Sequence, residues 1–203
     1  MADHEYRFRT RWIVPHGVDE VYGVLAEPRA LPRWWPAVYL AVEELEHGDP
    51  DGVGRVVSFF TKGWAPYTLR WQARVVAVRA PFEMRFEASG DLVGTGHWQL
   101  HPQGDATEVV FDWVIAAEKP LLKHLSPLLR PAFAANHAWA MRRGEESLRL
   151  ELARRAEADP DARARIPAPP APTPSSPLPA LLGGVGAVAL AAGSALLLRR
   201  PRR

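Results

Sequence analysis

The stretch FAANHAWAM, residues 133–141, places two polar side chains in the apolar stripe of a predicted helix. Steps of three or four residues lead from Phe133 to His137, Met141 and Leu148, and a stripe of this kind normally faces a core. Asn136 and His137 lie in or beside it. We interpret this face as the cover of a cavity, in which a few polar groups orient a carbonyl or hydroxyl of a ligand.

His137 has two interpretations. On a cavity wall it could exchange a proton near neutral pH as a general acid or base. Alternatively it is a structural histidine, hydrogen-bonded to a strand or to the preceding Pro-rich loop. Asn136, one position off the stripe, could instead cap or brace the start of the helix.

Tryptophan is abundant, with eight in 203 residues. Trp71, Trp98 and Trp113 fall on the apolar side of predicted strands, where they either fill a core or form a cavity wall suited to a flat or isoprenoid-like ligand. Trp34 and Trp35 should lie at the lip of the cavity, as a packed plug, as a gate over the entrance or as a contact with lipid. The predicted ligand-binding residues are Trp35, Trp71, Trp98, Trp113, Phe133, Asn136, His137 and Met141.

Other chemistries lack their residues. There is no Cys, which excludes disulfides and thiolate metal sites. His97 and His101 are four residues apart on a predicted strand, about 13 Å along its outer face, so we predict no metal site and no cofactor. No Ser-His-Asp spacing, phosphate loop or pair of inward carboxylates is recognisable. Arg55 is an anion-holding candidate if Val57 and Phe59 face inward, and solvated if they do not.

Charge separates the tail from the rest. Residues 1–158 carry 19 Lys and Arg against 21 Asp and Glu, whereas residues 159–203 carry 6 Arg against 2 Asp. The globular part is therefore nearly neutral, which argues against nucleic acid as a partner.

The elements that must position these residues form an α+β domain. A strand over Tyr6–Val14 is followed by a helix over Val18–Ala26 and a short helical turn between prolines. Six further strands are predicted at 37–46, 53–61, 67–79, 82–89, 92–101 and 107–117, joined by tight turns. From Pro120 the chain becomes helical, with interruptions at Pro127 and Pro131, and continues to about Ala156.

The strands alternate, with one apolar face each. Such a meander is covered on one side by a helix. Gly94 and Gly96, beside Trp98 on the inner face, indicate a sharp bend or a close approach. A bent sheet leaves a hollow that one helix does not fill.

This pattern resembles the START-related (SRPBCC) superfamily of polyketide cyclases and lipid-transfer proteins, the helix-grip fold. The segments that carry the resemblance, within Tyr6 to Arg155, are VPHGVDEVYGVLAEPRALPRWWPAV, GVGRVVSFF, GTGHWQLHPQGDATEVVFDWV and FAANHAWAMRRGEESLRLEL. The resemblance implies a curved seven-stranded antiparallel sheet wrapped around a long C-terminal helix, two short N-terminal helices, and a deep apolar cavity. It does not fix one function, because the superfamily includes enzymes, carriers and receptors.

The C-terminal part reads as a tether. We assign residues 1–157 to the ligand-binding domain, 158–177 to a Pro/Ala-rich disordered linker, 178–198 to a transmembrane helix and 199–203 to a basic tail. Leu178 to Leu198 contains no charge in 21 residues, and a helix of that length crosses a bilayer core of about 30 Å. Small residues at four-residue spacing permit weak self-association of this helix.

The location follows from both ends of the chain. The N-terminal MADHEYRFRTRW has no apolar signal region, so we expect a cytoplasmic domain on a single-pass C-terminal anchor. The Arg-rich end conflicts with this orientation under the positive-inside rule.

Three hypotheses follow. The first is a membrane-tethered binding module for a hydrophobic small molecule such as a lipid, an isoprenoid or a polyketide-like chain. The second is a cyclase or aromatase that uses His137 as acid or base. The third is a non-catalytic regulatory or stress protein.

Overall fold

The computed structural model describes residues 5–65, 67–117 and 126–174, and the side chains of these except 117 and 126–130. The chain divides into two units, Met1–Thr173 and Pro174–Arg203. The elements, in chain order, are β1 (Glu5–Val14), α1 (Val18–Leu25), the 3-10 turn η1 (Pro28–Ala30), α2 (Leu31–Trp34), β2 (Tyr39–Glu46), β3 (Val56–Lys62), β4 (Thr68–Arg79), β5 (Glu83–Gly90), β6 (Leu92–Gln103), β7 (Ala106–Ala117), α4 (Ser126–Ala156) and α5 (Pro160–Arg165).

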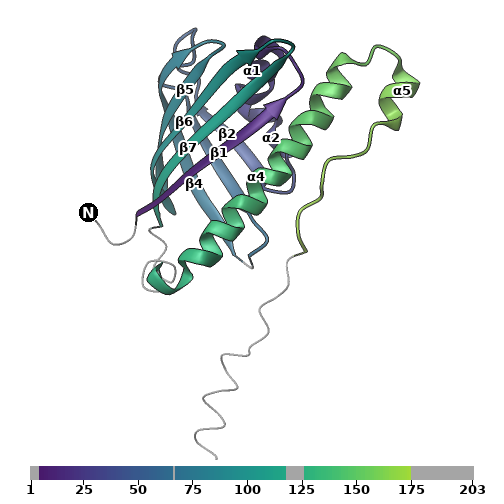
Figure 1. Cartoon of the computed structure of the whole chain (residues 1–203). Helices are drawn as coiled ribbons and strands as arrows, with labels where there is room; N and C mark the ends of the chain where they lie inside the picture. The colour runs from purple at the N-terminus through teal and green to yellow at the C-terminus, as the bar shows by residue number, and fades with distance from the viewer. Residues whose placement is uncertain (1–4, 66, 118–125, 175–203) are drawn as a thin grey trace, which may run out of the picture. The chain divides into compact units, whose positions relative to one another are not determined.

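The sheet has seven antiparallel strands in the order β1-β7-β6-β5-β4-β3-β2. Strands β2 to β7 form the predicted meander. The last of them, β7, pairs with β1, which forms one edge of the sheet, and Phe8 lies opposite Trp113. The sheet curves, and α4 lies across its open side (Figure 1). The predicted α+β class, the seven antiparallel strands and the long helix after them are confirmed.

The predicted inner face of the sheet is also confirmed. In β4, Trp71, Ala73 and Val75 are buried, while the residues between them face solvent. Close approach explains the inner glycines. A Cβ atom at Gly96 would lie 2.2 Å from the Phe86 ring, so only glycine leaves room for that ring.

The prediction that prolines interrupt the long helix was wrong. α4 is one helix from Ser126 to Ala156, with Pro131 inside it. Pro131 removes one backbone hydrogen bond, but it lies near the helix start. The apolar stripe that anchors α4 to the core comes later, at Met141, Leu148 and Leu152, all buried.

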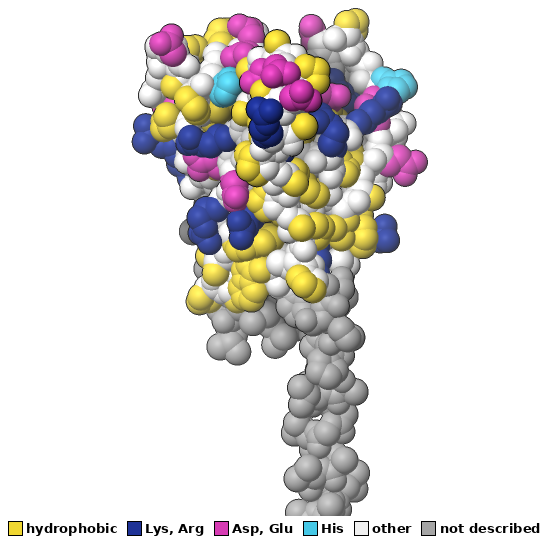
Figure 2. Space-filling view, turned by 90° about the vertical axis from the view of Figure 1, so that its right-hand side faces the viewer, with side chains coloured by type: hydrophobic (Ala, Val, Ile, Leu, Met, Phe, Trp, Pro, Cys, Tyr) yellow, Lys and Arg dark blue, Asp and Glu magenta, His cyan; other side chains and the backbone are white. Residues whose placement is uncertain are grey.

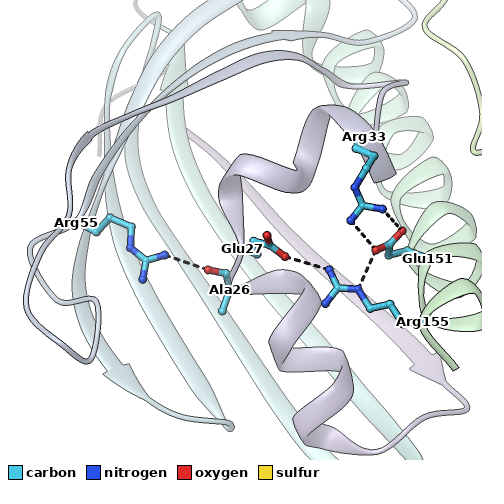
Figure 3. Close-up of polar contacts among 6 residues, drawn as sticks. All are labelled: Ala26, Glu27, Arg33, Arg55, Glu151 and Arg155. Atoms are coloured by element: carbon cyan, nitrogen blue, oxygen red, sulfur yellow. Dashed lines mark hydrogen bonds and ion pairs between the residues drawn. The ribbon is translucent and has the colours of Figure 1, made fainter.

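An ion-pair network joins α4 to the segment between α1 and α2 (Figure 3). Glu151, with 2% of its side chain exposed, accepts two hydrogen bonds from the Arg33 guanidinium, at 2.8 and 2.7 Å. Arg155 donates to Glu151 at 2.8 Å and to Glu27 at 3.1 Å. These bonds fix α2, and with it Trp34 and the adjacent Trp35, against the end of α4.

The segment after α4 was predicted to be a disordered linker. Its described part contains α5 and an extended stretch over residues 166–174. The predicted span 178–198 lies outside the described residues. None of the helices that are described is long and apolar enough to cross a membrane.

Candidate functional site

A cavity of about 160 Å³ lies between the inner face of the sheet and α4. All eight residues predicted to bind a ligand line it. The full lining is Tyr6, Phe8, Trp35, Val38, Tyr39, Thr61, Lys62, Gly63, Tyr67, Leu69, Trp71, Phe86, Leu92, Trp98, Phe111, Trp113, Ile115, Phe133, Asn136, His137, Ala140 and Met141. The sheet and the helix therefore do leave a hollow, as the curvature argument predicted.

The inner wall of this cavity is a layer of packed aromatic rings. Trp98 stacks on Phe111 with ring centroids 4.0 Å apart, and Trp71 lies 5.7 Å from Trp113. All four are buried. The tryptophans thus serve both of the predicted purposes, since they fill core space on one side and face the cavity on the other.

A second, smaller cavity of about 80 Å³ adjoins the first and reaches toward α1 and β3. The two share five aromatic lining residues, Trp35, Tyr39, Trp71, Phe86 and Trp98. These five side chains come from several strands and from the turn at the end of α2. We call the two cavities chambers, and the five shared side chains the aromatic partition between them.

Arg55, whose direction the strand pattern left open, lines the smaller chamber. Its guanidinium donates to the backbone carbonyl of Ala26 at 3.0 Å (Figure 3). Val57 and Phe59 are buried, which agrees with the inward alternative. Arg55 therefore places a cation at the end of this chamber nearest α1.

His137 is held by its neighbours. Its Nε2 lies 3.3 Å from the hydroxyl of Thr10, and its ring stacks on Phe8 at 4.2 Å. Burial lowers the pKa of His137 from its ordinary 6.5 to about 4. At neutral pH the imidazole is therefore uncharged. Among the predicted roles, this environment favours a neutral, hydrogen-bonding imidazole over proton exchange near pH 7.

Asn136 braces the loop between β3 and β4. Its side-chain oxygen accepts a hydrogen bond from the backbone N–H of Ala65 at 3.3 Å. Gly63 makes the approach possible, because a Cβ atom there would lie 2.1 Å from the same oxygen. Asn136 thus braces this loop rather than the start of α4, where the alternative prediction placed its role, and it also lines the cavity.

The two tryptophans of the proline turn differ. Trp34 is fully buried and does not line the main cavity, so it acts as a plug. Trp35 lines both chambers and packs against Gly144 of α4, where a Cβ atom would lie 2.3 Å from its ring. The indole N–H groups of both are buried without a partner among the described residues.

Several polar lining residues were not predicted. Burial raises the pKa of Tyr39 far above its ordinary value and that of Tyr67 to about 12, so both phenols stay protonated. Thr61 accepts a hydrogen bond from the Trp71 indole at 3.2 Å. The inward phase of Phe59 would have indicated Thr61, two residues further along β3. Lys62 breaks that alternation, and the sequence carries no signal for it.

The histidines considered for metal lie elsewhere. His97 sits on the outer face, 2.9 Å from a carboxylate oxygen of Glu83, and His101 is exposed. Within the described ranges, no group of three or more His, Asp or Glu side chains is placed to hold a metal ion.

A curved seven-stranded antiparallel sheet around a long helix, with an aromatic cavity between them, defines the START-like, or helix-grip, class of domain. Residues 6–153 match the family described as polyketide cyclase / dehydrase and lipid transport. The chain belongs to this family.

Solved structures of low sequence identity share the fold. The protein TTHA0849 from Thermus thermophilus is 17% identical with a TM-score of 0.61, covering 75% of this chain and 100% of its own. The Zhui aromatase/cyclase from Streptomyces sp. R1128 is 19% identical with a TM-score of 0.57, covering 76% and 98%. A START superfamily protein from Mycobacterium smegmatis is 15% identical with a TM-score of 0.53, covering 70% and 98%. No curated protein matches the sequence.

Proposed function

We propose that this protein is a membrane-tethered binding module that holds a hydrophobic small molecule between its sheet and α4. The observation that carries the proposal is the aromatic cavity of about 160 Å³. Membership of the family described as polyketide cyclase / dehydrase and lipid transport supports it. The tether is the uncharged stretch Leu178 to Leu198, which would keep the cavity close to the membrane in which apolar ligands dissolve.

The lining indicates the charge of the ligand. The cavity walls are mainly aromatic and aliphatic, and no Asp or Glu is among the described residues that line the main cavity. A cationic ligand would enter without a counter-charge, at a large desolvation cost. The phenols and the neutral His137 instead offer hydrogen bonds to a carbonyl or hydroxyl. Lys62 lines the main cavity and Arg55 the smaller one, so a neutral or anionic, mostly apolar molecule with one or two oxygen atoms fits best.

The size of the cavity adds a condition. Pockets for drug-sized ligands enclose about 300–1,000 Å³, more than either chamber provides. A ligand the size of an isoprenoid or polyketide chain therefore requires the aromatic partition to move, so that the two chambers join.

Native mass spectrometry of the full chain, extracted from membranes in a mild detergent, tests the binding function. We expect a bound apolar molecule on the wild type and on Ala138→Phe, whose substitution lies on the exposed side of α4. Ala140→Phe should lose it, because Ala140 lines the cavity and a phenyl ring would occupy that space. An empty wild type, or equal loading of both variants, would contradict the proposal.

The tether has a separate test. Deletion of residues 178–198 should move the protein from the membrane fraction to the soluble fraction. Protease accessibility of the domain in sealed vesicles would then decide between the cytoplasmic orientation and the reverse one. Retention of the deletion variant in the membrane fraction would exclude this segment as the anchor.

The second candidate is a cyclase or aromatase that uses His137. It is favoured by the position of this residue on the cavity wall and by the fold shared with an aromatase/cyclase. His137→Ala should abolish turnover of a polyketide-like substrate if this candidate is right, whereas it should only shift affinity in a binding module. A regulatory or stress protein, the third candidate, would show neither ligand nor turnover.

A further inference from the structure

The chain after α5 returns along α4 toward the start of that helix (Figure 1). We call residues 166–173 the strap. At its beginning, the Arg154 guanidinium donates to the carbonyls of Ile166, at 3.4 Å, and Pro167. At its end, the Thr173 hydroxyl donates to the carbonyl of Gly63 at 2.9 Å. The strap is therefore attached to the domain at both ends.

Its far end is attached to the rim of the main cavity. The Lys62 ammonium donates to the Thr173 carbonyl at 2.7 Å, and Lys62 is 6% exposed. Lys62, Gly63 and Tyr67 all line the cavity. The point at which the chain leaves the domain is thus the β3–β4 loop at the cavity rim.

This rim loop is braced and yet presents a large apolar side chain. Asn136 holds it from α4 and Thr173 holds it from the strap. Between these two anchor points, Trp64 has 44% of its surface exposed, while Ala65 beside it is buried. An indole with one apolar and one polar edge is the side chain most typical of the membrane–water interface.

The surface around the strap is also partly apolar. Hydrophobic side chains occupy much of the lower half of the face formed by α4 and the strap, toward the start of α4 (Figure 2). Acidic side chains gather at its upper end. The strap contributes Pro167, Ala168, Ala171 and Pro172 as exposed residues.

The strap also changes the length of the tether. If the whole linker from residue 158 were free, the domain could move tens of ångströms from the bilayer. With the strap attached through Thr173, only four residues separate it from Leu178, the first residue of the predicted span. The five Cα–Cα steps from Thr173 to Leu178 extend to at most about 18 Å.

We propose that the strap shortens the tether so that the cavity rim meets the bilayer, with Trp64 in the lipid interface. The partner of this surface is the lipid bilayer itself. Ligand would then pass between membrane and cavity across the rim loop, without crossing water. This inference rests on the proposed membrane tether, but it concerns the orientation of the domain rather than its attachment.

The test uses the full chain reconstituted into phosphatidylcholine vesicles, with or without bromine on the lipid acyl chains. Bromine quenches only tryptophans that are close to the lipid. We expect part of the wild-type emission to be quenched, and this part to be lost in Trp64→Phe. Trp139→Phe, which removes a half-buried indole from α4, should retain it.

A second variant tests the strap. Replacing residues 166–173 by a Gly/Ser sequence of equal length removes the Thr173 contacts and lengthens the free tether. We expect its quenching to fall to the level of Trp64→Phe, although it still floats with the vesicles.

The outcomes separate the two proposals. If the wild type does not float with vesicles, the tether is wrong. If it floats but Trp64→Phe leaves the quenched emission unchanged, the orientation proposed here is wrong. Undiminished quenching in the Gly/Ser variant would show that the strap does not set the tether length.

Discussion

Gly63 shows how one residue decides the geometry of the cavity rim. A Cβ atom there would overlap the Asn136 amide, with 2.1 Å to its oxygen. Gly63→Ala must push this amide away and break its bond to Ala65. We expect a loss of about 1–3 kcal/mol in the free energy of unfolding, as for overpacked sites generally, measured by urea denaturation.

Gly23→Ala is the matched control for this substitution. Gly23 lies in α1, and no atom comes within 4 Å of a Cβ placed there. Alanine in a helix interior is favoured over glycine by about 0.5–1 kcal/mol, so this variant should be more stable than the wild type. Equal stability of both variants would show that the contact with Asn136 does not constrain the rim.

His137 gives the folded state a pH dependence of known sign. The folded protein binds the His137 proton only near pH 4, while the unfolded chain binds it near 6.5. Between these values the unfolded state holds more protons, so the free energy of unfolding should decrease as pH falls from about 6.5 to 4. The contribution is a few kcal/mol at most, and it is constant above about pH 7.5.

His137→Gln supplies the comparison, because it keeps a polar side chain but does not titrate. Its stability should depend less steeply on pH over this interval, and an NMR titration of the wild-type imidazole should place its pKa well below 6. A pKa near 6.5 would mean that His137 is solvated, and would restore its candidacy as an acid or base near neutral pH.

Residue types predicted the apolar lining well and the polar lining poorly. Phase along strands and along α4 locates Trp71, Trp98 and Met141, since burial follows periodicity. Lys62 ends β3 and Tyr67 directly precedes β4, so both lie beside the β3–β4 loop, whose path is set by tertiary contacts. The role of Asn136 as a brace was also beyond periodicity, since its partner lies 71 residues away in sequence.

At the scale of elements, the clamp at Glu151 connects α4 to the α1–α2 segment. Burial alone would raise the pKa of the Glu151 carboxyl, but hydrogen bonds from Arg33 and Arg155 outweigh it and hold the pKa below its ordinary value. Glu151→Gln keeps the shape and removes the charge, so a buried acceptor loses its charged partners. We expect a loss of about 1–3 kcal/mol in thermal or urea unfolding.

Glu146→Gln is the control on the same helix. Glu146 pairs with Arg143 at 2.9 Å on the exposed side of α4, and such pairs contribute about 0–1 kcal/mol. Similar losses in both variants would indicate that the Glu151 network does not hold the α1–α2 segment more firmly than a surface pair does.

Element boundaries were predictable wherever periodicity was strong. The strands of the meander begin and end within a few residues of their predicted positions, because turn residues and alternating burial mark them. The long helix was predicted with interruptions because proline removes a backbone hydrogen bond. α4 tolerates Pro131 near its start, since downstream packing at Leu148 and Leu152 stabilises the helix.

At the scale of the whole molecule, the extended chain after α5 links the cavity rim to the C-terminal segment. Composition alone favoured disorder here, because prolines and alanines bury little surface. Lys62 and Arg154 of the domain donate hydrogen bonds to the backbone carbonyls of Thr173 and Ile166 in the strap, and composition does not reveal such bonds. The predicted span stays a prediction.

Hydrogen exchange can show whether the strap stabilises the rim. A chain that ends at Arg165 lacks the bonds of Thr173 to Lys62 and Gly63, whereas a chain that ends at Thr173 retains them. In the shorter chain we expect faster amide exchange at Gly63 and Ala65, since loops held by few contacts open locally at low cost. Exchange in the paired strands β6 and β7 should be the same in both chains, because the strap does not contribute to that ladder. Faster exchange throughout the sheet would instead identify the strap as part of the global fold, and unchanged exchange at the rim would mean that Asn136 alone holds the loop in place.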